Sequence, residues 1–213
     1  MRLILALLML TTGAHAQDAT PLDSTVRAEP GAVALYLQAV DLYALGQRAR
    51  DPLMVVTAAR AIEGLTLTDV ARLPDPAPAA QPAVTPLDAA TLLATARTLD
   101  AGANYADLIE QVAREPTPKP KALSATGSTL PPGKAETWTL SFYGGTYAEL
   151  AILGDGRSNL DLTVSDAAGR VICADHGSAD RAICGFALRD NGAVKVTVTN
   201  AGDGPGTYML LTQ

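Results

Sequence analysis

The last third of the chain, residues 136–213, constrains the fold more than any other part. It is a run of short segments in which apolar and polar residues alternate, separated by turn residues such as Gly144-Gly145 and the stretch 166–169. Strict alternation is typical of strands with one buried and one solvated face. Seven or eight such strands over residues 135–213 predict an antiparallel β-sandwich of the jelly-roll kind.

The two cysteines of the chain, Cys173 and Cys184, lie inside this region on either side of a polar loop, 175–180. In an exported protein, two cysteines at this spacing could face each other across a hairpin and form a disulfide. Closing that loop would stabilise the fold by roughly 3 kcal/mol. Metal binding by two lone thiolates is the weaker alternative.

The first sixteen residues predict export. Arg2 supplies a positive start, residues 3–10 are apolar, and Ala14-His15-Ala16 has small residues at both positions that signal peptidase reads. We expect the mature chain to begin at Gln17 and to be periplasmic or secreted. The apolar run is too short to span a bilayer and no later segment is long and uncharged enough, so we expect no membrane insertion. An N-terminal core helix is the disfavoured alternative.

Residues 30–115 change to a helical period. Apolar stripes predict helices over 30–45, ending near Gly46, and over 51–63, followed by one extra turn around 68–72. A proline-rich spacer at 74–86 precedes a second helix pair at about 87–99 and 105–114. Short connections favour two antiparallel hairpins.

The domain outline is therefore α+β and multidomain. Residues 17–29 form an N-terminal linker, 30–115 the helical region, 116–134 a proline-rich linker and 135–213 the sandwich. We expect few contacts across the second linker, so that the helical and β parts are separable.

Charge and composition exclude several classes of partner. The chain has 16 Lys and Arg against 22 Asp and Glu, for a formal net charge of −6. A nucleic-acid binder needs a basic surface that this balance does not supply. Aromatic residues make up 4% of the chain, so a stacking platform is scarce, and Trp138 is expected in the sandwich core, although with Tyr143 it could form a small ligand-contacting patch.

Four short motifs resemble the bacterial pre-peptidase C-terminal domain. They are Gly154-Asp155, the strand 159–162, the turn 166–169 and Gly206-Thr207-Tyr208. The resemblance covers about residues 135–213 and implies a non-catalytic accessory or binding β-sandwich. Asn159 stands where the family commonly has an acid, which weakens any metal site carried over from it.

The inventory of reactive side chains argues against an enzyme. His176 is the one histidine left after signal cleavage, and its neighbours Asp175 and Ser178 lie too close along the chain to build a catalytic triad. Asp155, Asn159 and Asp161, with Asp166 and Asp175, offer oxygen ligands for calcium, but their spacing lacks the EF-hand order, and solvated surface acids are the favoured interpretation. No cofactor is expected.

Two functions remain open at this point. The preferred one is a non-enzymatic interaction protein whose helical part presents an apolar groove to a protein partner in the cell envelope. The alternative is an extracellular polysaccharide- or peptide-binding module, calcium-dependent in one version, that would use a concave sandwich face lined by Trp138 or tyrosines. A hydrolase is a distant third.

Overall fold

The computed structural model describes residues 21–78, 81–83, 85–115 and 121–213. The predicted signal peptide, residues 1–16, lies outside this range. Within it, four helices and nine strands follow one another: α1 Ala32–Ala49, α2 Pro52–Ile62, β1 Leu65–Asp69, α3 Ala89–Leu99, α4 Ala106–Arg114, β2 Lys121–Leu130, β3 Ala135–Phe142, β4 Tyr147–Gly154, β5 Leu160–Ser165, β6 Val171–Asp175, β7 Arg181–Ala187, β8 Gly192–Asn200 and β9 Gly206–Thr212.

The strands form two sheets. The five-stranded sheet has the order β1-β2-β9-β4-β7 and the four-stranded sheet the order β3-β8-β5-β6. Every pairing is antiparallel except that of β1 with β2, which is parallel. Helices precede a mostly antiparallel sandwich, so the predicted fold class is confirmed.

The alternating residues of the two sheets meet in a sandwich core. Leu160, Leu162 and Val164 of β5 face it, and so does Trp138, whose side chain is fully buried as predicted. The intervening residues of β5, such as Asp161 and Thr163, are half-buried on the opposite face of the sheet. The period of two thus places one apolar face of each strand inside.

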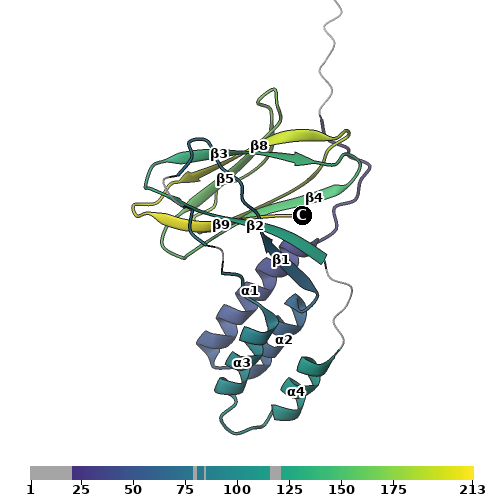
Figure 1. The fold of residues 1–213 in the computed structure, drawn as a ribbon, viewed down its shortest axis with the longest axis vertical. Helices are drawn as coiled ribbons and strands as arrows, with labels where there is room; N and C mark the ends of the chain where they lie inside the picture. The colour runs from purple at the N-terminus through teal and green to yellow at the C-terminus, as the bar shows by residue number, and fades with distance from the viewer. Residues whose placement is uncertain (1–20, 79–80, 84, 116–120) are drawn as a thin grey trace, which may run out of the picture.

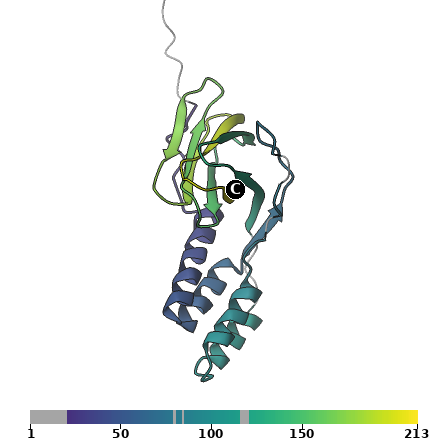
Figure 2. The ribbon, with the colours of Figure 1, turned by 90° about the vertical axis from the view of Figure 1, so that its left-hand side faces the viewer.

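The helices extend away from the outer face of the five-stranded sheet, and α1 is the helix that meets β2 and β4 (Figures 1 and 2). Their core is continuous with residues of the sheet, among them Leu123 of β2, Leu153 of β4 and Leu211 of β9. Strand β4 is therefore buried on both faces along Ala148–Leu153. None of the helices in the described part of the chain has the length and apolar character needed to cross a membrane.

Strands β1 and β2 correct the sequence analysis. Residues 65–69 follow the expected helix and overlap the extra turn expected at 68–72, and residues 121–130 were expected within the 116–134 linker. Residues 65–69 instead form a strand that pairs with 121–125. Serine, threonine and glycine made 121–130 look like a linker, yet its Leu123 and Ala125 alternate into the helical core. The pairing of β1 with β2 and the shared core contradict the expectation that few contacts join the helical and β parts.

The predicted helices are confirmed, with one change at the end of α1. The helix continues through Gly46 and ends at Ala49, and Arg50, whose backbone is left-handed at φ 53°, caps it. A Cβ on Gly46 would lie 2.9 Å from Met54 Cβ and 2.9 Å from Val55 Cγ2. Gly46 therefore serves the close approach of α1 to α2 and does not terminate the helix.

The predicted disulfide between Cys173 and Cys184 is confirmed, but its setting differs from a hairpin. Cys173 lies on β6 and Cys184 on β7, which belong to different sheets and pair with β5 and β4 respectively. The disulfide therefore links the two sheets where their edge strands meet.

Candidate binding site

The predicted metal candidates lie before and on the outer face of β5. Asp155 Oδ1 accepts a hydrogen bond from the Arg157 amide at 3.2 Å, and its Oδ2 lies 3.9 Å from Arg157 Nε. Asn159 Oδ1 and Asp161 Oδ1 are buried and have no hydrogen-bond partner. Within the described ranges, no three or more His, Cys, Asp or Glu side chains are grouped so as to hold a metal ion.

The triad-like string 175–178 does not form a catalytic arrangement among the residues described. His176 Nε2 lies 2.8 Å from Thr163 Oγ1 on β5, while Asp175 Oδ2 accepts from the Ile183 amide at 3.2 Å. The Asp175 carboxylate thus supports β7 and does not orient the imidazole. A triad requires a hydrogen bond between the carboxylate and the imidazole.

Trp138 belongs to a buried polar network and offers no surface to a ligand. Its Nε1 donates to Tyr208 OH at 3.0 Å, and Tyr208 in turn donates to the Glu136 carboxylate. Burial, with a smaller contribution from Glu136, raises the pKa of Tyr208 well above its ordinary value. Tyr143 is 77% exposed, so the aromatic patch proposed for Trp138 and Tyr143 is not formed.

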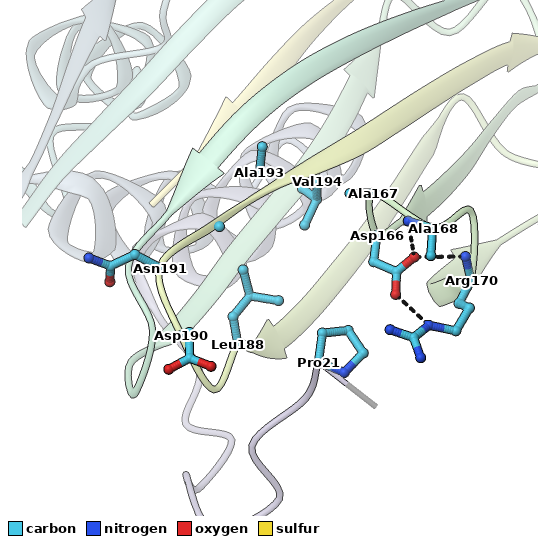
Figure 3. A pocket seen from close by; sticks show the side chains of 11 residues that line it. Pro21, Asp166, Ala167, Ala168, Arg170, Leu188, Asp190, Asn191, Ala193 and Val194 are labelled. Atoms are coloured by element: carbon cyan, nitrogen blue, oxygen red, sulfur yellow. Dashed lines mark hydrogen bonds and ion pairs between the residues drawn. The ribbon is translucent and has the colours of Figure 1, made fainter. Parts of the chain in front are cut away.

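One shallow pocket lies at an end of the sandwich (Figure 3). Its volume is about 310 Å³ and its wall is mostly apolar, with Leu188 and Val194 near Pro21. Figure 3 shows the pair Asp166 and Arg170 on one side. Hydrogen bonding from the Arg170 side chain lowers the pKa of Asp166, whose oxygens also accept from the backbone of the turn. These groups hold the β5–β6 turn.

A larger site lies along β1, between this strand and residues 81–83 and 86–90; we name it the β1 slot. It consists of two cavities, of about 430 and 390 Å³. The first lies between Leu65–Leu67 and 86–90, with Tyr36 and Ile62 beneath. The second lies between residues 69–71, 81–83 and the β2 residues 126–127.

Hydrogen bonds fix the wall of the slot opposite β1. Tyr36 OH, from buried α1, accepts from the Leu87 amide at 2.9 Å, and burial raises the pKa of this tyrosine. Asp88 caps α3 by accepting from the Thr91 amide at 2.7 Å, which lowers the pKa of its carboxyl group. The first cavity is therefore held between the ends of three helices and a strand.

The chemistry of the slot suits binding. Its lining mixes apolar and polar surface. Its acids are Glu63, which pairs with Arg60 at 2.9 Å, Asp69 and Asp88, and no Lys, Arg or His is among the residues that line either cavity. Sequence reasoning missed the site because it predicts no strand at 65–69, only an extra turn around 68–72, and a spacer at 74–86. The alternation Leu-Thr-Leu-Thr after Gly64 is the signal that indicates a strand there.

Comparisons with known proteins find similarity among solved structures. No protein-family model matches it, and no curated protein matches it. Solved structures do resemble it. The pre-peptidase C-terminal domain of a Bacillus anthracis collagenase is 14% identical, with a TM-score of 0.35, over 42% of this chain and 87% of that one.

Two other solved structures match with similar coverage of this chain. The periplasmic g-type lysozyme inhibitor PliG of Aeromonas hydrophila is 16% identical, with a TM-score of 0.31, over 43% of this chain and 86% of that one. The C-terminal carbohydrate-binding module of a Zobellia galactanivorans laminarinase is 10% identical, with a TM-score of 0.28, over 42% and 79%. A pre-peptidase C-terminal domain, the family that the sequence motifs resemble, is thus among the similar structures, and the chain has a β-sandwich of that kind.

Proposed function

We propose that this chain is an exported, non-enzymatic interaction protein that binds a protein partner of the cell envelope through the β1 slot. The slot carries the proposal, because it is a partly apolar cavity at the junction of the helices and the sheet, with Leu65, Leu67 and Leu87 in its wall. A pocket with an apolar lining and a few fixed polar groups is the usual form of a binding site.

Two further observations support it. His176 contacts the Thr163 hydroxyl, but Asp175 accepts from the Ile183 amide and does not orient the imidazole as a triad carboxylate would. The Cys173–Cys184 disulfide suits an oxidising compartment, which agrees with the signal-like start of the sequence.

Filling the slot tests the proposal. Ala90 lines the first cavity from the start of α3, so Ala90→Trp should block it. Ala94, one turn further along α3 and also exposed, does not line the slot, so Ala94→Trp is the matched control. Mature protein of each form is used to capture partners from the native envelope fraction, with quantitative mass spectrometry as the readout.

We expect Ala90→Trp to capture at least about tenfold less partner than the unmodified protein. Ala94→Trp should capture as much as the unmodified protein. Thermal melts establish that both variants fold. Equal capture by the two tryptophan variants, or no capture above background by the unmodified protein, would contradict the proposal.

A further inference from the structure

The outer edge of β1 is unpaired. β1 is the last strand of the five-stranded sheet and pairs with β2 on one side. The Lys121 amide donates to the Gly64 carbonyl at 2.8 Å, and the Val70 amide donates to the Ala125 carbonyl at 2.9 Å. Backbone groups of successive residues in a strand point to opposite sides, so residues 64, 66, 68 and 70 face β2.

It follows that the N–H and C=O groups of Leu65, Leu67 and Asp69 point away from the sheet. No hydrogen bond joins them to any residue in the described ranges. Strand edges of this kind are templates for another strand, and proteins usually cover them.

Two other edge strands of the sandwich are each covered at one position. At the end of β7, Leu22 forms a bridge with Leu188, and the Asp23 amide donates to the Ala187 carbonyl at 2.9 Å. On β3, Asp75 and Thr137 exchange two backbone hydrogen bonds of 2.8 and 2.9 Å.

The β1 slot opens along this edge. Three consecutive residues, Leu65–Leu67, line the first cavity, and residues 69–71 line the second. Side chains of consecutive strand residues lie on opposite faces, so a cavity that touches all three runs along the strand edge. The facing segment contains Pro82 and Pro86, which have no N–H to donate to β1.

The charge of the slot selects its occupant. Of the three acids that line it, Glu63 pairs with Arg60 at 2.9 Å and Asp88 caps α3, which leaves Asp69, in a chain whose net charge is −6. Asp69 is exposed, and the structure gives its carboxylate no hydrogen bond or ion pair. Lysine or arginine side chains on an incoming segment would complement these acids.

We infer that the β1 slot takes an extended, cationic segment of a partner protein as an added strand on β1. This inference rests on the proposed function and specifies its chemistry. Backbone hydrogen bonds to Leu65, Leu67 and Asp69 supply affinity, while alternate apolar side chains of the partner enter the cavities.

Amide hydrogen exchange tests the inference on the mature protein. The probe is a synthetic peptide of alternating lysine and valine, and its glutamate–valine counterpart is the control. In the free protein the amides of Leu65, Leu67 and Asp69 should exchange faster than those of Thr66 and Thr68. The lysine peptide should slow the outward amides by about tenfold or more, and the glutamate peptide should not.

Two variants separate charge from edge geometry. Asp69→Lys should weaken lysine-peptide binding at least about tenfold, whereas Asp190→Lys, an exposed acid outside the slot, should leave it unchanged. The inference would be overturned if the outward amides were already protected in the free protein, or if both peptides protected them equally. A dimer in sedimentation, with these amides protected, would mean that a second copy covers the edge and would also overturn it. If Ala90→Trp abolishes partner capture but the lysine peptide does not protect these amides, the proposed function stands and strand addition is rejected.

Discussion

Glu149 is a buried acid whose place is explained by the helix that follows the N-terminal segment. Gly31, before α1, has no capping side chain of its own. Instead Glu149 on β4 accepts from the amides of Gly31 at 2.8 Å and Ala34 at 3.1 Å, and Gln213 Oε1 accepts from the Ala32 amide at 2.5 Å. The negative carboxylate also complements the positive end of the helix.

Replacing Glu149 should therefore destabilise the protein. Glu149→Ala leaves two amides without partners in a buried setting, and we expect a loss of about 1–3 kcal/mol in the free energy of unfolding, measured by urea titration. Glu149→Gln keeps one acceptor oxygen and should lose less. An unchanged urea midpoint for Glu149→Ala would show that the amides find other partners.

At the scale of elements, the sequence predicts best where one period dominates. The four helices and the strands after residue 135 follow their apolar stripes, and Trp138 is buried as expected. The misses are β1 and β2, whose parallel pairing joins residues more than fifty positions apart, as in Leu67 with Leu123. Local pattern does not encode such a pairing, and the β1 slot depends on it. The disulfide partners were predictable because there are two cysteines, but the placement of their strands in different sheets was not.

The disulfide should matter more for holding β6 and β7 together than for closing a loop. Both are edge strands, and no strand ladder joins them, so Cys173–Cys184 is the covalent link between the sheets at that edge. The double variant Cys173→Ala with Cys184→Ala should lose roughly 3 kcal/mol in the free energy of unfolding. In the double variant, the rate of amide exchange should increase more in β6 than in β3. Uniform acceleration in both strands would mean that the link acts on the unfolded chain alone.

The whole molecule is organised around the five-stranded sheet, which lies between two cores. One face contributes to the core with the four-stranded sheet, and the other contributes to the core with the helices. Strand β4 is therefore buried on both faces. The helices thereby shield apolar side chains that an isolated sandwich would expose, including Leu153 and Leu211. This arrangement also sets the β1 slot, because α2 leads directly into β1 and α3 begins across from it.

A fragment of residues 121–213 should therefore be less stable than the full chain. Without residues 21–115 it loses β1, the Glu149-capped helix α1 and the cover over Leu123, Leu153 and Leu211. We expect the fragment to bind a hydrophobic dye and to unfold at a lower temperature, whereas the mature chain unfolds in one transition with its helical and sheet signals coincident. Separate helical and sheet transitions in the mature chain, together with a fragment that is as stable as the whole, would instead support two independent domains. In that outcome the β1 slot would lie between domains that fold without each other, and its shape would depend on their docking.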